Sequence, residues 1–192
     1  MTNPLLLILN FAVNVFALFC LLRFLLQLAK ANFYSPIVES IKRITDPVLQ
    51  PIRKFLPTSG QIDLASLIAV LILFSISEYL LTTRVAGDAL GILPIWAFPW
   101  NGAVEAVKFS IWIYLVAILI SVIMSWIAPN IYSPAAELAR QLADPFLAPI
   151  RKFLPSMAGF DFSPMIAMFV LLAVQSYVLP YLRILPSTSL PT

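Results

Sequence analysis

A motif of twelve residues occurs twice in this chain, and the two copies lie 98 residues apart. The motif Asp-Pro-x-Leu-x-Pro-Ile-Arg-Lys-Phe-Leu-Pro runs from Asp46 to Pro57 and again from Asp144 to Pro155. Half of the 32 positions from Asn32 to Asp63 are identical to their partners at this spacing. A whole unit is therefore duplicated, and the polar, proline-rich part of the unit has changed least between the copies.

The composition places this duplicated unit in a membrane. Apolar residues make up 61% of the chain and charged residues 11%, with a mean hydropathy of +0.95; charged residues approach about a quarter of a soluble domain. The charged residues separate four apolar segments, each long enough to cross the hydrocarbon core of a bilayer. These predicted spans are Leu5 to Ala29, Leu64 to Thr83, Val104 to Ile127 and Phe162 to Leu182. We expect the first span to stay in the mature protein, because no basic region precedes it and no clear cleavage site follows.

The spacing of the repeat predicts how the spans are organised. Each copy contributes two spans, so both copies enter the membrane in the same direction and are related by an axis along the membrane normal. We predict an all-α membrane protein with a first repeat at 1–83, an outer-face linker at 84–102 and a second repeat at 103–192. The linker contains Pro94, Trp96 and Trp100, and Trp favours the headgroup level, so we expect it to lie against the outer membrane surface. A re-entrant hairpin is the alternative.

The charge distribution predicts an orientation. The two links within the repeats carry eight basic residues, namely Lys30, Lys42, Arg43, Arg53, Lys54, Arg140, Arg151 and Lys152. The opposite side of the membrane carries three, Arg84, Lys108 and Arg183. Because cytoplasmic loops are enriched in Lys and Arg, we expect both motifs in the cytoplasm and both termini outside.

The motif itself predicts a helix that lies in the membrane interface. Ser35-Pro36 and Asp46-Pro47 each combine an N-capping residue with a proline at the first helical position, so two short helices are expected in this link. The second of these has an apolar face and a basic back, as has its copy in the other repeat. Such a helix in each hairpin connection either anchors the spans or binds anionic lipid or a partner. In a more specific version of the binding alternative, the two motifs face each other across the pseudo-twofold axis. The predicted contact residues are Arg53, Lys54, Phe55, Arg151, Lys152 and Phe153.

Four aspartates are predicted to cap helices. Asp46 and Asp144 open the two motif copies, while Asp63 and Asp161 directly precede the second span of each repeat. An Asp at a helix start accepts hydrogen bonds from the first backbone N–H groups and interacts favourably with the helix dipole. A salt bridge from Asp63 or Asp161 back to the motif arginine is an alternative, and both uses are structural.

Ionisable residues inside spans are candidates for function by default. Arg23 and Glu78 lie within spans one and two, and the second repeat has Ser121 and Ser176 at these positions. We expect Arg23 to reach the cytoplasmic headgroups. Glu78 lies deeper, and its candidate hydrogen-bond partners are Asn14 and Lys108. These three form either an asymmetric ion or proton site or a buried polar cluster that holds the helices together.

The residue types of the chain exclude most kinds of catalytic and metal-binding site. The chain has no His and a single Cys20, so neither Ser-His-Asp nor Cys-His arrangements, nor most transition-metal sites, can be assembled from it. No Gly-rich phosphate-binding loop is present. The net charge of +3 forms no basic stripe, which argues against nucleic acid as a partner. We expect no enzymatic activity, no metal and no cofactor.

The motif and its surroundings resemble the YggT family of small bacterial membrane proteins, also called YlmG, over the whole chain and in the two-repeat form. Arg23 matches the arginine that this family usually carries in its first span, and Asp161-Phe162-Ser163-Pro164 matches the start of its second span. The first repeat departs from the family with Ile62-Asp63-Leu64-Ala65-Ser66, and the second lacks the arginine. A role tied to these residues is therefore expected in one copy only.

The resemblance implies a multi-pass protein of the bacterial cytoplasmic membrane. Relatives are associated with osmotic tolerance and ion homeostasis, with cell division or nucleoid distribution, and in plastids with assembly of a haem-carrying cytochrome complex. This chain lacks the usual haem ligands.

Our leading hypothesis is a non-enzymatic scaffold or assembly factor whose paired cytoplasmic motifs bind anionic lipid or a membrane or cytoplasmic protein. The alternative is an ion-handling protein with a site around Glu78. A homo-oligomer is compatible with either hypothesis.

Overall fold

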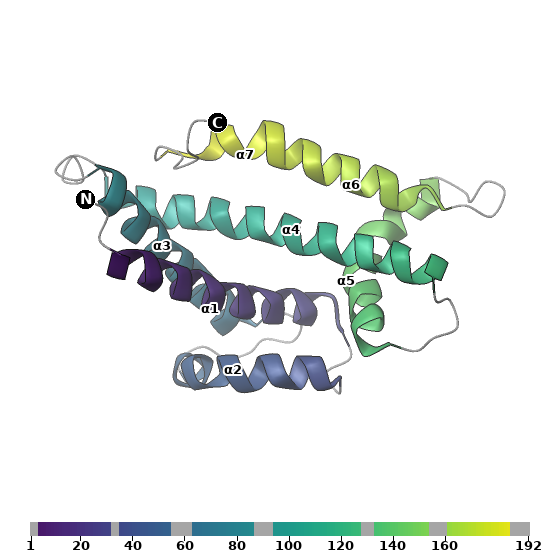
Figure 1. The fold of residues 1–192 in the computed structure, drawn as a ribbon, viewed down its shortest axis with the longest axis horizontal. Coiled ribbons are helices and arrows are strands. Elements are labelled where there is room, and N and C mark those ends of the chain that lie inside the picture. Colours follow the sequence, from purple (N-terminus) through teal and green to yellow (C-terminus); the bar gives the residue numbers. More distant parts are fainter. Residues whose placement is uncertain are drawn as a thin grey trace.

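The computed structural model describes residues 4–31, 35–54, 63–86, 94–127, 133–153 and 161–184. All regular structure in these ranges is helical, and four helical segments are long and apolar enough to cross a membrane (Figure 1). They are Pro4–Leu28, Leu64–Thr83, Ala97–Trp126 and Ser163–Leu182. The predicted class, an all-α protein with four spans in two tandem repeats, is confirmed.

The element order repeats the pattern of span, connecting helix and span. The first repeat contains α1 (Pro4–Leu28), α2 (Pro36–Arg53) and α3 (Leu64–Ala86). The second contains α4 (Ala97–Ile127), α5 (Pro134–Phe153) and a last span formed by α6 (Ser163–Ala173), the π-helical turn η2 (Val174–Val178) and α7 (Leu179–Leu182). In Figure 1, α1 begins and α7 ends at the same end of the bundle, as expected for two hairpins inserted in the same direction.

Helix α4 begins earlier than the sequence predicts. It starts at Ala97 instead of Val104, so part of the predicted outer linker is the first turns of a span. Pro99 is tolerated there, because backbone N–H groups in the first turn of a helix have no acceptor within the helix and none is lost with proline. The side-chain amide of Asn101 donates to the Ala97 carbonyl at 2.7 Å, which closes the turn. Trp100 thus lies in the first turn of α4 and Trp96 directly precedes it, while residues 87–93, on which the re-entrant alternative depends, lie outside the described ranges.

Helices α2 and α5 are each continuous, and the prediction of two short helices per link is wrong. Pro47 lies inside α2 and Pro145 lies inside α5. Each proline removes one backbone hydrogen bond from the helix. Packing offsets that loss, because one face of each helix is buried against the spans, with Leu49 and Leu147 fully covered.

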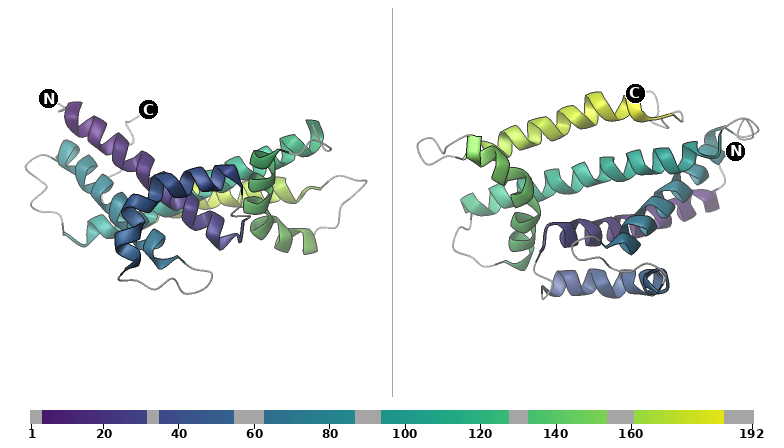
Figure 2. Two further views of the ribbon diagram at one scale, coloured as in Figure 1. Left: turned by 90° about the horizontal axis from the view of Figure 1, so that it is seen from below. Right: turned by 180° about the vertical axis from the view of Figure 1, so that it is seen from behind.

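The two connecting helices lie across the spans that precede them. Figure 1 shows α5 crossing α4, and the view from below in Figure 2 shows α2 crossing α1. The two connecting helices approach each other near their N-terminal ends, whereas their C-terminal ends, which carry the motif, point apart. The predicted face-to-face arrangement of the two motifs is therefore wrong for the described residues. Each motif is instead fastened to its own hairpin.

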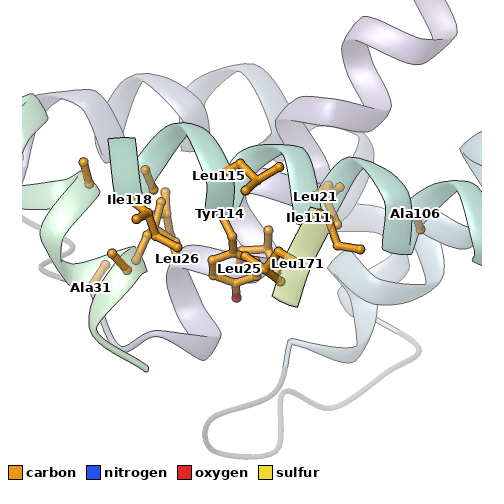
Figure 3. Packing of buried hydrophobic residues seen from close by; sticks show 14 of the residues in the cluster. Leu21, Leu25, Leu26, Ala31, Ala106, Ile111, Tyr114, Leu115, Ile118 and Leu171 are labelled. Carbon is orange, nitrogen blue, oxygen red and sulfur yellow. The ribbon is translucent and has the colours of Figure 1, made fainter. Parts of the chain in front are cut away.

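One apolar core joins the two repeats. Leu25 of α1, Tyr114 of α4 and Leu171 of α6 gather at its centre (Figure 3). The ring of Tyr114 also packs against Phe146 of α5, with centroids 4.3 Å apart. Van der Waals packing of this kind is the main force between helices in lipid. The repeats therefore form a single packed unit.

A tight turn sends the chain from α1 towards α2. Ala31 donates its N–H to the Leu26 carbonyl and Lys30 donates to the Gln27 carbonyl, the two hydrogen bonds of a Schellman motif. Lys30 has a φ of 52°, in the left-handed region where glycine is usual. The contact of buried Ala31 with buried Leu26 stabilises this helix end.

Candidate functional site

In the first repeat, Arg53 joins two aspartates that are far apart along the chain. Its Nη2 donates to Asp63 Oδ2, and its Nη1 lies 3.7 Å from Asp46 Oδ1. Asp46 lies on α2, whereas Asp63 directly precedes α3. The salt bridge from Asp63 to the motif arginine, one of the two predicted alternatives, is therefore present. We call Asp46, Arg53 and Asp63 the first clamp.

Asp63 also caps α3, as the sequence predicts. Its Oδ1 accepts the Ser66 backbone N–H at 3.3 Å, and its Oδ2 accepts the Ser66 hydroxyl at 2.7 Å. The side chain is 0% exposed. Burial alone would raise the pKa of Asp63, but the hydrogen bonds from Arg53 and Ser66 outweigh it and hold the pKa below the usual value. Asp63 is therefore a buried, ionised carboxylate at neutral pH.

Arg23 joins the first clamp from inside the membrane. Its Nη1 donates to Asp46 Oδ1 at 2.7 Å and to Thr45 Oγ1 at 2.6 Å. The prediction that Arg23 reaches the lipid headgroups is wrong, since its side chain is buried. An unpaired guanidinium in lipid is costly, and α2 supplies the acceptors that remove this cost. The pair of Arg23 with Asp46 ties α2 to α1, and the pair of Arg53 with Asp63 ties it to the start of α3.

The second repeat contains the same bridge. Arg151 Nε donates to Asp161 Oδ2 at 2.8 Å, and its Nη1 donates to Asp144 Oδ1 at 3.3 Å. Asp161 Oδ1 accepts the Ser163 backbone N–H at 2.9 Å at the start of α6. We call Asp144, Arg151 and Asp161 the second clamp. In both repeats the motif arginine therefore fastens the connecting helix to the start of the following span.

The second clamp is more exposed than the first and lacks the intramembrane arginine. Its side chains are 44%, 38% and 39% exposed for Arg151, Asp144 and Asp161. Burial raises the pKa of Asp161, but hydrogen bonds from Ser163 and Arg151 lower it further, below the usual value. Asp144 receives its second cation from Arg140 at 3.5 Å, on the same helix. No described charge thus ties α5 to α4.

Asp46 and Asp144 do not cap separate helices, because their carboxylates accept from the clamp arginines inside continuous helices. That part of the capping prediction is wrong.

The basic residues of the motif divide into two groups. The arginines pair with the clamp aspartates, whereas Lys54 and Lys152 are exposed and form no ion pair with any residue in the described ranges. Phe153 is 85% exposed beside Lys152. Phe55, the predicted counterpart in the first repeat, lies outside the described residues.

A second charged cluster lies near the ends of the spans away from the connections within the repeats, the side that the charge distribution predicts to be outside. Arg183 Nη2 donates to both carboxylate oxygens of Glu78 at 2.9 and 3.0 Å, and its Nη1 donates to Glu105 at 2.8 Å. Lys108 bonds Glu105 at 2.9 Å, so it is not the partner of Glu78 that the sequence suggested. We call these four residues the outer cluster. It contains two carboxylates and two cations and is balanced in charge.

Arg183 is the residue that sequence reasoning missed. It follows the last span, and Glu78 lies near the same membrane face on span two. This shared depth could have predicted the pair from the sequence. The contact fastens the last span of the second repeat to α3 and α4. Trp100 and Asn101 add to it by bonding the backbone of Leu182 and Ile184 at 2.6 and 3.1 Å.

Asn14 belongs to a neutral polar cluster, and its predicted bond to Glu78 is absent from its described contacts. Its amide donates to Asn10 Oδ1 at 2.6 Å and to Ser77 Oγ at 2.7 Å. Ser77 in turn donates to Asn10 Oδ1 at 2.7 Å. The three side chains tie α1 to α3, which is the alternative of a buried polar cluster that holds helices together.

Among the described residues, no group of three or more His, Cys, Asp or Glu side chains could hold a metal ion. The clamps and the outer cluster pair their carboxylates with cations inside the chain. The site is thus a set of electrostatic ties between helices, with exposed lysines and Phe153 at the motif ends.

Known proteins are similar to this chain over most of its length. The CCB3/YggT family model matches residues 2–84 and 100–182. The Uncharacterized protein YggT of Escherichia coli K12 is 34% identical to the chain, covering 98% of it and 96% of the relative. A relative from Pseudomonas aeruginosa is 36% identical over 86% of this chain and 83% of its own. One from Haemophilus influenzae is 33% identical over 88% of both. No solved structure matches the chain significantly.

Proposed function

Because the chain belongs to the CCB3/YggT family, and because its charges are used to fasten helices together, we propose that it is a non-enzymatic membrane scaffold or assembly factor. It resides in the bacterial cytoplasmic membrane, with both clamps in the cytoplasm and both termini outside. Its two motif ends bind anionic lipid or a partner protein. The role in osmotic tolerance or cell-envelope and division processes that the family resemblance implies would follow from that binding.

The observation that supports the proposal best is that the arginines and the lysines of the motif make different contacts. Arg53 and Arg151 fix the shape of each hairpin by bridging two aspartates. Lys54, Lys152 and Phe153 project outward from the same short segment. A cation and an aromatic ring presented from a fixed helix end suit a docking surface, because little conformational freedom remains to be lost on binding.

Contact with the inner leaflet is supported by a second face of α2. Ile37, Ile44 and Val48 form an exposed apolar stripe beside the buried face of this helix. An amphipathic helix next to membrane spans commonly lays such a stripe into the headgroup region. A lysine near an anionic leaflet contributes about 1 kcal/mol to this attraction. Lys54 is well placed to add to it.

The exposed lysines offer a cleaner test than the arginines. Reversing the charge of Arg53 would break the first clamp, so loss of function would not distinguish binding from misfolding. We therefore choose Lys54→Glu combined with Lys152→Glu, with Arg43→Glu as the control. Arg43 is an exposed cation of α2 that pairs with Glu39 at the surface, so its reversal changes charge without touching the motif.

The readout is photocrosslinking in membranes from a probe placed at Phe153. We expect an adduct with one defined protein or with anionic lipid, reduced at least severalfold by the double lysine reversal and unchanged by Arg43→Glu. Absence of any adduct, or an adduct indifferent to the lysines, would contradict the proposal.

The outer cluster gives the ion-handling hypothesis no specific support. Glu78 is neutralised by Arg183, and the second carboxylate of the cluster is paired as well. A scaffold predicts that liposomes containing the protein show no more ion flux than empty liposomes, and that Glu78→Gln leaves this unchanged.

A further inference from the structure

The last turn of α5, residues 150–153, follows a proline and is poorly covered. Leu147, in the turn before, is 1% exposed, whereas Ile150 is only partly buried and Phe153 is 85% exposed. Pro149 lies inside the helix and has no N–H, so one backbone hydrogen bond between these two turns is missing. Packing and backbone bonds therefore hold the last turn less firmly than the rest of α5.

The side-chain ties of this turn all come from Arg151. It donates to Asp161 at 2.8 Å and to Asp144 at 3.3 Å. No other side chain of the turn forms a hydrogen bond or an ion pair within the part of the chain that the structure describes. Both pairs join side chains that are more than a third exposed, and Asp144 is shared with Arg140. The position of the last turn thus depends on two exposed ion pairs.

The equivalent turn of α2 is held by a contact that the protein covers. The two turns have the same sequence from the proline to the lysine, and Pro51 interrupts α2 as Pro149 interrupts α5. Arg53, however, pairs with Asp63, whose side chain is 0% exposed. Their neighbour Asp46 also pairs with a buried arginine of α1. The two turns therefore differ in how their ion pairs are buried and not in their own residues.

Dissolved salt acts unequally on these two contacts. The Debye length, beyond which exposed charges are largely screened from one another, is about 10 Å at 0.1 M salt and about 3 Å at 1 M. High salt thus brings the screening length down to the distances within the second clamp. Buried pairs are screened much less, and Asp63 is buried. A rise in salt should weaken the tie of α5 and spare that of α2.

We propose that the last turn of α5 is a salt-sensitive element, fixed at low ionic strength and released at high ionic strength, whereas the equivalent turn of α2 stays fixed under both conditions. The consequence rests on the proposed function, because the regulated surface is the docking surface at Lys152 and Phe153. Release gives this surface conformational freedom that binding must remove again, so docking there weakens as ionic strength rises.

Spin labels at the two equivalent lysines test this proposal. A nitroxide is attached to Lys152→Cys or to Lys54→Cys in the full chain with Cys20→Ala, in phosphatidylcholine vesicles with equal KCl inside and outside. These lipids have no net charge, so attraction to lipid adds no salt dependence.

Between about 0.05 M and about 1 M KCl we expect the ratio of mobile to immobile label to rise about two- to fivefold at position 152. At position 54 the ratio should change by less than about 1.5-fold. An equal response at both positions, or no response at position 152, would overturn the proposal.

Two controls identify the cause of the release. Sucrose at the osmolality of the KCl solution carries no charge and should leave both labels unchanged, and a response to sucrose at position 152 would contradict screening. Asp161→Asn removes the charge but keeps a side chain that can cap α6. In this variant the label at position 152 should be mobile already at low KCl, and an immobile label would rule out the second clamp as the tie.

The photocrosslink from Phe153 separates this proposal from the proposed function. In Asp161→Asn the adduct should already be weaker at low KCl than in the unchanged clamp. A label that ignores salt, together with an adduct, would overturn the salt-sensitive turn alone. A label released as expected, without an adduct at any KCl concentration, would support the salt-sensitive turn and overturn the docking surface.

Discussion

The two clamps contain the same three residue types, but Asp63 of the first is buried whereas Asp161 of the second is exposed. Asp63 is fully buried, and Asp46 forms an ion pair with Arg23, which lies within a span. Asp161 is exposed, and the position equivalent to Arg23 is Ser121. The contribution of the motif to stability is therefore decided by residues that lie outside it.

This difference has a physical basis. Removing one partner of a buried ion pair strands the other charge in a low-dielectric environment, whereas an exposed pair is replaced by water at little cost. We accordingly expect the first repeat to hold its connecting helix firmly and the second to release it more easily. The following substitutions test that contrast.

The largest difference is expected between Asp63→Asn and Asp161→Asn. The first change removes the buried partner of Arg53, which keeps only Asp46 at 3.7 Å, and should lower the free energy of unfolding by about 1.5–3 kcal/mol. The second should cost less than about 1 kcal/mol. Unfolding in mixed detergent micelles, followed by tryptophan fluorescence, measures both. Equal losses would remove the distinction between the clamps.

Exchanging Arg23 with Ser121, its counterpart in the second repeat, tests how much the intramembrane arginine contributes to stability. Arg23→Ser gives the first repeat the residue of the second and should cost about 1.5–3 kcal/mol, the usual contribution of a hydrogen bond to a charged group. Ser121→Arg should bring no gain in stability, because Asp144 already has two cations and the new guanidinium inside the span would lack a free acceptor. The same unfolding assay applies, and a neutral Arg23→Ser would show that α2 does not need this tie.

The contact between the repeats can be compared with the contacts inside them. A Cβ added to Gly102 of α4 would lie 2.7 Å from the backbone nitrogen of Ser75 in α3, too close to be relieved without moving a helix. Gly102→Ala should therefore cost about 1–3 kcal/mol by overpacking. Val116→Ala, at an exposed position of the same helix, is the control and should have little effect. If both variants unfold alike, α3 and α4 are not in tight contact.

The smallest effect is expected from pH. The folded-state pKa of Asp63 is lowered, so its stabilising contribution is fully present above the unfolded value of about 3.9 and is lost as pH falls through the lower folded value. The stability difference between wild type and Asp63→Asn should thus be constant from pH 5 to about pH 8 and shrink below about pH 4. A difference that grows on acidification would have the wrong sign.

Much of this architecture follows from sequence because it depends on local pattern. Apolar length gives the spans, the repeat gives their direction, and an acidic residue before an apolar run gives the Asp63 cap. The start of α4 and the continuity of α2 through Pro47 did not follow, because tertiary packing there outweighs local signals.

The partners of polar residues in the spans were the least predictable part of the site. Arg23, Asn14 and Glu78 each have a partner other than the one expected. Depth along a span restricts which residues can meet, but the rotation of each helix decides which do. The Arg183 contact depended on how the last span sits against α3 and α4.

The central claim is that both clamps lie on one side of the membrane, at the connections of two hairpins inserted in parallel. The direct measurement is labelling of Lys54→Cys and Lys152→Cys by a membrane-impermeant maleimide, in a Cys20→Ala background and in vesicles of each orientation. Both positions are exposed. We predict that both are labelled in inside-out vesicles and neither in right-side-out vesicles. Labelling of the two positions from opposite sides, or of both from outside the cell, would contradict the account.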